Sequence, residues 1–317
     1  MRSFREALRP FSHTAIIGTD VDWLAPGLRE ADRGYLVPKY DKDVFIKKML
    51  EICIQENIDM LIPLIDPELS IYADAKRIIL DNGADVIISN PSVIDLCSSK
   101  AKTARFFSET GLPFLETLEI GEIKGDQDIH FPAILKPCLG SGGKDVYLVE
   151  NMHEVEALSN RIDNPIIQER AEGQEITLDC LADFSGSPVR IVARERLEIR
   201  SGESSKGRTF KDNNLLRLVF ELLSNLHAIG PVTVQCFRSN GKYVFSEINP
   251  RFGGGYPLSH AAGANFPALL IQMYNRQQIK GQLDEYEENL YFCRYDDAFY
   301  FRKDEGQSKF PSPDGKD

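Results

Sequence analysis

Two apolar segments in the C-terminal third of the chain flank a turn and carry side chains suited to metal chemistry. Val232–Phe237 and Tyr243–Ile248 are separated by Ser239-Asn240-Gly241-Lys242, a turn signal that predicts an antiparallel hairpin. Because side chains alternate between the two faces of a strand, Glu247 and Asn249 are expected on one face of the second strand. The hairpin therefore presents a carboxylate and an amide oxygen on the same side.

Two further residues extend this group of polar side chains. Gln235 belongs to the first strand, and Arg251 follows the second strand, shortly before Gly253-Gly254-Gly255. Carboxylate and amide oxygens are hard ligands that Mg²⁺ prefers, and a guanidinium pairs well with phosphate. Activation of a nucleotide triphosphate uses both kinds of group. A sheet end with solvated polar residues and a glycine-rich loop has the same composition, so these residues alone leave both interpretations open.

A second motif consists of a strand, a glycine-rich turn and another strand. Phe131–Pro137 is apolar and carries Lys136 near its end, Gly140-Ser141-Gly142-Gly143-Lys144 forms the turn, and Asp145–Val149 is the next strand. The glycines do not open a helix, so this is not the Walker arrangement. Backbone N–H groups at such a hairpin tip can bind phosphate, with Lys136 near the α- and β-phosphates. An ordinary hairpin with a surface lysine is the alternative.

A third motif joins two strands through a short polar linker. An apolar strand ends at Ile166–Gln168, the linker runs to Gly173, and a new strand starts near Glu175. Backbone groups of a linker can form hydrogen bonds with the edge of an adenine, and a carboxylate can accept from ribose hydroxyls. The acidic residues would equally suit a solvated connection.

In this order, the three motifs resemble the ATP-grasp superfamily, most closely a single ATP-grasp half of the carbamoyl phosphate synthase large subunit and related carboxylate–amine ligases. The resemblance covers about residues 14 to 280. It implies phosphate contacts for Lys100, Lys136 and the mobile loop formed by Gly140, Ser141, Gly142, Gly143 and Lys144. It also implies an adenine-contacting hinge at Gln168 to Ala171, with Glu169 and Ala171 acting through backbone groups, and a ribose-binding carboxylate at Glu175.

The same resemblance implies ATP and Mg²⁺ (or Mn²⁺) as cofactors. Gln235 and Glu247 resemble the metal-bridging pair, and Asn249 resembles a further metal ligand. Arg251 resembles the catalytic arginine that faces the transferred phosphate, and Lys136 the catalytic lysine. The carbamoyl phosphate synthase half itself has a glutamine at the first metal position, whereas many other ATP-grasp ligases have an acidic residue there.

The function implied by the resemblance is that of an ATP-dependent ligase, which activates a small carboxylate as an acyl phosphate for attack by an amine. A non-catalytic ATP-binding regulatory protein and a kinase for a small acid are the alternatives. The expected partners are small-molecule carboxylate and amine substrates, with a homodimer expected only by analogy with the family.

The composition argues against several other functions. The chain of 317 residues has a formal net charge of −11, which argues against nucleic acid or an anionic membrane as the main partner. No apolar run approaches the roughly 20 residues that span a bilayer, and no signal peptide is recognisable. The 6 cysteines form no CxxC pair, as expected for reduced thiols. We therefore expect a cytoplasmic protein.

The N-terminal part alternates segments typical of strands and helices, which predicts an α/β arrangement. Strands are predicted at Thr14–Asp20, Met60–Ile65 and Asp85–Ser89, with helical periodicity over Asp43–Asn57 and Glu68–Asn82 between them. Such alternation predicts a parallel, Rossmann-like sheet covered by helices. The fold class is therefore α/β and α+β, with this sheet preceding an ATP-grasp domain.

The N-terminal domain is expected to lack its first strand. Similar ATP-grasp proteins usually have a strand and a glycine-rich turn before the first helix, whereas Ser3–Arg9 already looks helical here. A second uncertain segment is Arg194–Lys211, whose composition suits either a flexible loop or a solvated β-edge. The predicted limits are 1–97 for the N-terminal domain, 98–285 for the ATP-grasp domain with a small lid subdomain at about 115–170 and a large subdomain at about 171–285, and 286–317 for a partly disordered tail.

Overall fold

The computed structural model describes residues 1–39, 41–123, 125, 129–140, 143–200, 202–279 and 282–302. In this part the chain forms two compact units. Unit 1 contains Met1–Ile88, Asn265–Ile279 and the described residues from Arg294 onward, and unit 2 contains Ser89–Ala264 and the described residues that follow up to Cys293. The predicted domain limits stay a proposal. The predicted loop positions Ser141 and Gly142, and the predicted disordered end at 303–317, lie outside the described residues.

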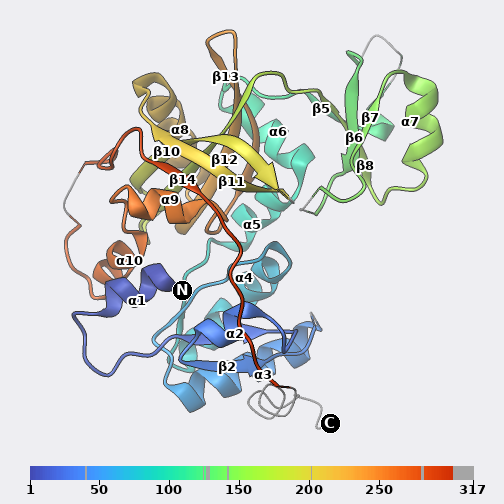
Figure 1. Cartoon of the computed structure of the whole chain (residues 1–317). Coiled ribbons are helices and arrows are strands. Elements are labelled where there is room, and N and C mark those ends of the chain that lie inside the picture. Colours follow the sequence, from blue (N-terminus) through green and yellow to red (C-terminus); the bar gives the residue numbers. More distant parts are fainter. Residues whose placement is uncertain are drawn as a thin grey trace. The chain divides into compact units, whose positions relative to one another are not determined.

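Unit 1 contains two pairs of parallel strands with helices between them (Figure 1). β1 pairs with β2, and β3 pairs with β4, which confirms the predicted N-terminal parallel-sheet domain. Parallel neighbours need a crossover connection, and helices provide it here. The elements are α1 (Arg2–Leu8), β1 (Ile17–Asp20), α2 (Pro26–Glu30), β2 (Arg33–Leu36), α3 (Lys42–Glu56), β3 (Met60–Leu61), α4 (Asp66–Asp81), β4 (Asp85–Val86) and α10 (Phe266–Tyr274).

The two long helices of unit 1 begin and pack as their sequences predict. The Asp41 side chain accepts a hydrogen bond from the Val44 N–H at 3.2 Å and so caps α3, which ends at Asn57 in the left-handed conformation. Phe45 of α3 and Tyr72 of α4 are both buried, and their rings meet edge to face with centroids 5.5 Å apart. Aromatic packing therefore joins the two helices.

The start of α4 carries two acidic residues. Asp66 is the first helical residue, and Ile65 occupies the N-cap position without a side-chain hydrogen bond. Asp66 and Glu68 lie in the first turn, where the helix dipole favours negative charge. Burial, with a smaller contribution from the charge of Asp20, raises the pKa of the Glu68 carboxyl to about 7.

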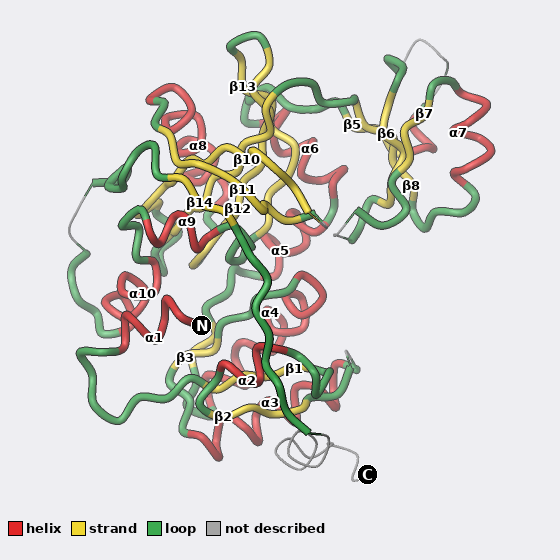
Figure 2. The backbone as a smooth tube through the Cα atoms, in the orientation of Figure 1, coloured by secondary structure: helices red, strands yellow, loops and turns green. Residues whose placement is uncertain are grey.

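Unit 2 is built around a six-stranded sheet with the strand order β13-β12-β9-β10-β11-β14, in which every neighbouring pair is antiparallel (Figure 2). Its strands are β9 (Gln174–Ala182), β10 (Pro188–Arg200), β11 (Glu203–Phe210), β12 (Gly230–Ser239), β13 (Lys242–Asn249) and β14 (Tyr291–Cys293). The helices next to it in sequence are α5 (Pro91–Ser98), α6 (Lys100–Glu109), α8 (Asn213–Leu226) and α9 (Tyr256–Ala261).

The large sheet has one apolar face, which forms the main core of unit 2. A row of directly paired residues crosses five strands on this face, and all of them are buried: Ile248, Val234, Leu178, Ala193 and Phe210. Buried residues of α5, α6 and α8 belong to the same apolar cluster. Because side chains alternate, the neighbouring positions on each strand must face the other way, and apart from Val192 these positions are polar.

The segment Arg194–Lys211 contains a pair of strands rather than a flexible loop. Its described residues form part of β10 and all of β11, and β10 lies between β9 and β11 as far as Glu195. Beyond Arg196, β10 pairs with β11 alone and Leu197 to Arg200 are exposed, so the expectation of a solvated β-edge is correct for this end of the strand only. Charged residues in an internal strand survive here because they pair across strands, as in the ion pair between Glu195 and Arg208 at 2.6 Å.

A second sheet in unit 2 has the strand order β5-β8-β6-β7, with α7 on one side (Figure 1). Its elements are β5 (Thr117–Glu119), η1 (Ile120–Glu122), β6 (Ala133–Pro137), β7 (Tyr147–Val149), α7 (Met152–Ser159) and β8 (Pro165–Glu169). Asn151 caps α7 as predicted, since its side chain accepts from the Glu154 N–H at 3.1 Å. The core of this sheet includes Leu135, Val149 and Val155.

Candidate functional site

The polar face of the large sheet contains the three residues predicted to bind metal, together with Glu175. Glu247 of β13 lies opposite Gln235 of β12, which confirms the predicted hairpin, and Gln235 lies opposite Thr177 of β9. Asn249 lies opposite Thr233 in the adjacent row of the same face. Directly paired residues of antiparallel strands share a face, so these side chains converge.

Gln235 forms hydrogen bonds with groups on both sides of it. With its amide oriented to satisfy both neighbours, Gln235 donates from Nε2 to Glu247 Oε2 at 2.7 Å and accepts from Arg196 Nη1 at 3.0 Å. Arg196 Nη1 also forms an ion pair with the carboxylate of Glu175, and Arg196 Nη2 donates to the Gly202 carbonyl at 2.6 Å. Glu175, Gln235 and Glu247 thus belong to one hydrogen-bonded network.

The sequence indicated Arg196 only as one of three arginines, with Arg194 and Arg200, that a flexible loop could bring toward phosphate or carboxylate. Its side chain is 8% exposed, although it carries a full charge. The period-two pattern of a strand was weak here, because Ala193 and Leu197 are apolar but Glu195 between them is charged. The many glycine, serine and basic residues nearby obscured that pattern.

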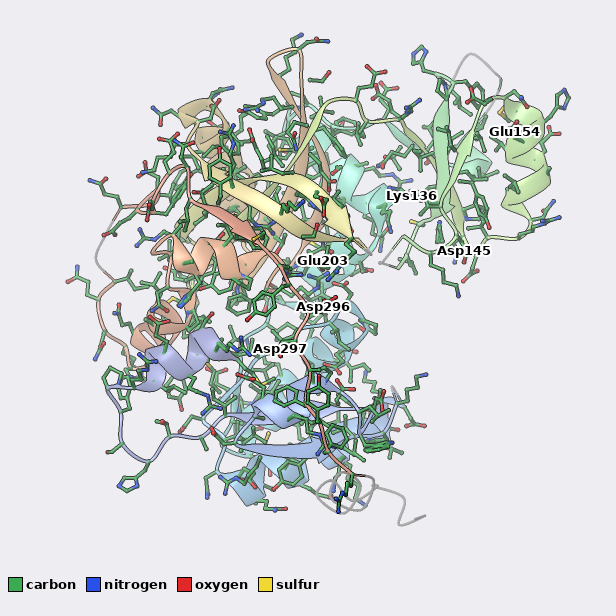
Figure 3. All side chains as sticks on the ribbon, viewed as in Figure 1. Lys136, Asp145, Glu154, Glu203, Asp296 and Asp297 are labelled. Carbon is green, nitrogen blue, oxygen red and sulfur yellow. The ribbon has the colours of Figure 1, made fainter. Side chains whose placement is uncertain are left out.

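Lys136, on β6 of the smaller sheet (Figure 3), is the first of three polar side chains that are joined by hydrogen bonds across three strands. Its Nζ donates to Gln168 Oε1 at 2.7 Å, and Gln168 Nε2 donates to Thr117 Oγ1 at 2.8 Å. Gln168 is buried, and its main chain lies within the strand ladder opposite Ile134. The structure therefore shows a role for the Gln168 side chain, which orients Lys136, in addition to the predicted hinge position.

Lys136 lies in an environment that weakens its hold on a proton. Burial is the main cause and the positive charge of Lys100 adds to it, whereas Glu247 acts in the opposite direction. Together they lower the pKa of the Lys136 ammonium to about 8. An added anion near Lys100 and Lys136 would relieve this strain, so the position favours binding of a negatively charged group such as phosphate.

The start of the glycine-rich turn lies against Lys100. Lys100 Nζ donates to the Gly140 carbonyl at 2.7 Å, and the Lys100 N–H donates to the Cys138 carbonyl at 3.1 Å. Gly140 and Gly143 have φ values of +103° and +70°, a region that glycine adopts without the strain other residues incur. A Cβ added at either position would meet no atom within 4 Å, so backbone conformation and not crowding accounts for these glycines.

The predicted hinge has part of its backbone already engaged. The Glu169 N–H donates to the Glu116 carbonyl at 2.8 Å, and β8 ends at Glu169. Ala171 follows outside the strand. The predicted adenine contacts of this segment would therefore come from groups that follow the last ladder bond.

Arg251 lies two residues after the end of β13. Its N–H donates to the Asn249 carbonyl at 2.8 Å, and its Nη1 donates to the Phe252 carbonyl at 3.0 Å. Thr233 Oγ1 donates to the Arg251 carbonyl at 3.0 Å, which attaches the turn to the neighbouring strand. The structure thus places Arg251 just beyond the end of β13 that carries Glu247 and Asn249.

The donor set of the polar face fits a hard divalent cation. Glu247 would supply a carboxylate and Asn249 an amide oxygen, the ligand types that Mg²⁺ takes. The Gln235 amide oxygen accepts from Arg196 in this structure, so it would have to turn toward Glu247 to bind the same ion. Across the described ranges, no group of three or more His, Cys, Asp or Glu side chains is arranged to hold a metal ion. In the same ranges, no helix has the length and apolarity that a membrane span requires.

Comparison with known families gives two matches. Residues 1–87 match a family model described as the PylC-like N-terminal domain, and residues 161–291 match one described as ATP-grasp in the biosynthetic pathway with Ter operon. The predicted resemblance to the ATP-grasp superfamily is confirmed by these matches, and the chain has an ATP-grasp fold preceded by a parallel-sheet domain.

The similar curated proteins include carbamoyl phosphate synthases and a formyltransferase. A carbamoyl-phosphate synthase from Methanobrevibacter smithii is 27% identical over 263 residues, which cover 74% of this chain and 70% of the relative. The carbamoyl phosphate synthase large chain of Pseudothermotoga lettingae is 24% identical over 81% of this chain, which spans 24% of that protein. A formate-dependent phosphoribosylglycinamide formyltransferase from Prochlorococcus marinus is 25% identical, covering 74% of this chain and 63% of the relative.

Solved structures share the fold. The biotin carboxylase domain of the Hydrogenobacter thermophilus 2-oxoglutarate carboxylase, solved with MgADP, ADP and bicarbonate, has a TM-score of 0.70 at 15% identity over 92% of this chain and 70% of that one. Biotin carboxylase from Campylobacter jejuni, solved as a complex with beta-gamma-ATP, has a TM-score of 0.69 at 16% identity over 92% of this chain and 71% of that one. The expectations of an ATP-dependent enzyme, and of ATP and Mg²⁺ as its cofactors, agree with these relatives.

Proposed function

We propose that this protein is an ATP-dependent ligase that activates a small carboxylate as an acyl phosphate, which an amine then attacks. The observation that carries the proposal is the pairing of Gln235 with Glu247 across β12 and β13, on the sheet face that also holds Glu175. Binding of a nucleotide alone does not need a paired carboxylate and amide at this position. The names of the similar proteins support the reaction class, and the small-molecule partners are part of the proposal.

The proposed chemistry follows from charge. A carboxylate is anionic and a poor electrophile, so its oxygen first attacks the γ-phosphorus of ATP, and the bond to the leaving ADP breaks. The acyl phosphate then has a good leaving group, and the amine nitrogen displaces phosphate at the acyl carbon while losing a proton. This sequence needs no covalent nucleophile from the protein. The protein's contribution is positioning and charge stabilisation.

Each part of the nucleotide has proposed contacts. Lys100, Lys136 and the glycine loop would bind phosphate oxygens, and Arg251 would stabilise charge on the transferred phosphoryl group. Glu247, Gln235 and Asn249 would hold Mg²⁺, which supplies charge neutralisation of the phosphates when bound. The proposed nucleoside contacts are Glu175 with the ribose hydroxyls and the main chain of Gln168, Glu169 and Ala171 with the adenine edge.

The test is Mg²⁺-dependent release of ADP by the purified protein in the presence of a pool of amino acids and other small acids. We expect release that needs both Mg²⁺ and one component of the pool, and separation of the pool then names the acid. Glu247→Ala serves as the blank, because removal of a preorganised charged group typically costs about 10²- to 10³-fold in rate. Glu221→Ala is the matched control, since Glu221 is an exposed residue of α8 paired with Arg217 at 2.7 Å.

Several outcomes would contradict the proposal. Activity of Glu247→Ala near that of the wild type would remove the metal assignment. A stable phosphorylated acid as the product would indicate a small-acid kinase instead. Binding of MgATP without release under any pool would favour the regulatory alternative, and absence of nucleotide binding would end the ATP-grasp interpretation of the site.

A further inference from the structure

A buried ion pair lies on the polar face of the large sheet, next to the proposed metal ligands. Arg194 Nε donates to Asp179 Oδ2 at 2.8 Å, and Arg194 Nη2 donates to Asp179 Oδ1 at 3.3 Å. The two side chains are 3% and 2% exposed. Arg194 belongs to the row that contains Gln235 and Glu247, and Asp179 belongs to the row that contains Thr233 and Asn249.

The remaining polar atoms of this pair are also bound. Ser259 of α9 donates from Oγ to Asp179 Oδ2 at 2.6 Å. Arg194 Nη1 donates to Ser204 Oγ of β11 at 3.2 Å. The pair therefore connects three strands and a helix, and its donors are directed at protein groups. Three of the five N–H donors of Arg194 are therefore engaged by protein groups.

The loop after β13, formed by Gly253, Gly254 and Gly255, packs against this ion pair. A Cβ added at Gly255 would lie 2.2 Å from Arg194 Nη1, and one at Gly253 would lie 2.9 Å from Asp179 Oδ1. A Cβ at Gly254 would lie 2.1 Å from the carboxylate of Glu203, at the start of β11 (Figure 3). None of these glycines has a positive φ. Crowding against buried side chains, and not backbone conformation, therefore accounts for Gly253 and Gly255, whereas the exposed Glu203 side chain could move away from a Cβ at Gly254.

The loop in turn fixes the residues next to it in sequence. Arg251 lies two residues before Gly253, and its carbonyl accepts from Thr233 Oγ1, which would also be 2.8 Å from a Cβ at Gly253. The Arg251 N–H donates to the Asn249 carbonyl. A displacement of the loop from the Arg194–Asp179 pair would therefore move Arg251 and Asn249.

We propose that Arg194 and Asp179 form a positioning pair that holds Arg251 in the geometry required to bind the terminal phosphate of ATP. The inference rests on the proposed function of the same site. A buried ion pair is weak evidence for stability, because the cost of removing two charges from water offsets their attraction. The pair instead gives Gly253 and Gly255 a fixed surface to pack against, and so determines where the loop after β13 lies.

The test compares binding of two nucleotides by calorimetry with Mg²⁺ present: ADP and a non-hydrolysable ATP analogue. The ratio of their dissociation constants reports contacts with the terminal phosphate, to which Arg251 is assigned. We expect Arg194→Lys and Ser259→Ala to change this ratio in the direction that Arg251→Ala changes it. Because residues in one packed network affect each other's contribution to binding, we expect about a tenfold change for Arg194→Lys and a smaller one for Ser259→Ala.

The controls separate positioning from general stability. Arg208→Lys alters an ion pair of the same sheet, with Glu195, whose residues alternate onto the opposite face from Arg194. It should leave the ratio unchanged even where it lowers the unfolding temperature. In the double variant Arg194→Lys/Arg251→Ala, the ratio should equal that of Arg251→Ala alone, because the positioned group is already gone.

The outcomes distinguish this inference from the proposed function. Wild-type protein that binds neither nucleotide would overturn both. Normal binding by the wild type, with an unchanged ratio in folded Arg194→Lys and Ser259→Ala, would overturn the positioning role alone. Additive effects in the double variant would also overturn it. Ser259→Ala removes only one hydroxyl, so it keeps the test valid if Arg194→Lys fails to fold.

Discussion

Arg196 of β10 forms an ion pair with Glu175 of β9, and its guanidinium also donates to Gln235. One buried cation therefore joins the proposed ribose carboxylate to a proposed metal ligand. These two residues are 60 positions apart in sequence but lie on neighbouring strands, since β9 pairs with both β10 and β12. The residues proposed to bind the nucleotide and the metal are thereby linked through one side chain.

This linkage predicts the effect of replacing Arg196. In Arg196→Gln, Glu175 loses its charged partner and Gln235 loses a donor, so the dissociation constant for MgADP should rise by about tenfold. The double variant Arg196→Gln/Glu175→Gln should lose less than the sum of the two single losses. Calorimetry measures both, and strictly additive losses would contradict the linkage. Arg217→Gln, which breaks an exposed pair on α8, is the control and should bind normally.

The lowered pKa of Lys136 predicts how nucleotide affinity depends on pH. The ammonium, with a pKa of about 8, is needed to bind phosphate, so affinity for ADP should fall as the pH rises above about 8. Lys136→Arg keeps its charge and should remove most of this decline. Fluorescence or calorimetric titrations with ADP, from about pH 6.5 to about pH 9.5, measure this decline in affinity. These limits lie about 1.5 units on either side of the pKa. An equal decline in both proteins would assign the effect to another group.

The same shift predicts a pH effect on stability with a defined sign. Lys136 has an ordinary pKa of 10.5 when unfolded and about 8 when folded, so the unfolded chain binds more protons between these values. The free energy of unfolding contributed by this group must therefore rise with pH from about 8 to 10.5. Urea unfolding at several pH values measures it. Lys136→Met, which cannot titrate, should lack this rise.

The raised pKa of Glu68 predicts the opposite dependence of stability on pH, in a lower pH range. Its carboxyl has an ordinary pKa of 4.5 and a pKa of about 7 in the folded protein, so the folded state binds more protons between these values. The free energy of unfolding should therefore fall as the pH rises from 4.5 to about 7, by at most about 3 kcal/mol. Glu68→Gln should remove this fall and stabilise the protein at pH 8, whereas Glu51→Gln, on α3, should not. A destabilising Glu68→Gln at pH 8 would contradict the assignment.

The apolar face of the large sheet predicts a large effect for a residue of α8. Leu222 is completely buried in the cluster that covers this face, so Leu222→Ala should lower the free energy of unfolding by about 2–5 kcal/mol. Phe220, on the same helix, is 42% exposed, and Phe220→Ala should cost less than about 1 kcal/mol. Urea unfolding of both variants tests the assignment of the two faces, and similar losses would contradict it.

Local sequence patterns predicted the elements whose side chains repeat regularly. The hairpin of β12 and β13 follows from two apolar runs around Asn240-Gly241, and α3 and α4 follow from helical periodicity. Lys136 at the end of β6 was predicted in the same way. These features depend on residues close together in the chain, so their physical causes are visible in the sequence.

The interior position of β10 could not be predicted from its own residues. Arg194, Glu195 and Arg196 favour solvent when considered singly, and their burial depends on partners from distant strands: Asp179, Arg208 and Glu175. Asp179 in turn lies among apolar residues of β9, where its carboxylate gave no sign of a partner. A charge is stable inside a protein only when it is paired, and pairing is a non-local property.

The sequence by itself determined the chemical types available at the site and the face of each strand on which they lie, because side chains alternate along a strand. Only the tertiary structure decided that β9 lies between β12 and β10, which brings Glu175, Gln235 and Arg196 together. It also decided that the three glycines lie against Arg194, Asp179 and Glu203. Strand order and such close approaches depend on packing of the apolar face against distant helices, which no short segment of sequence encodes.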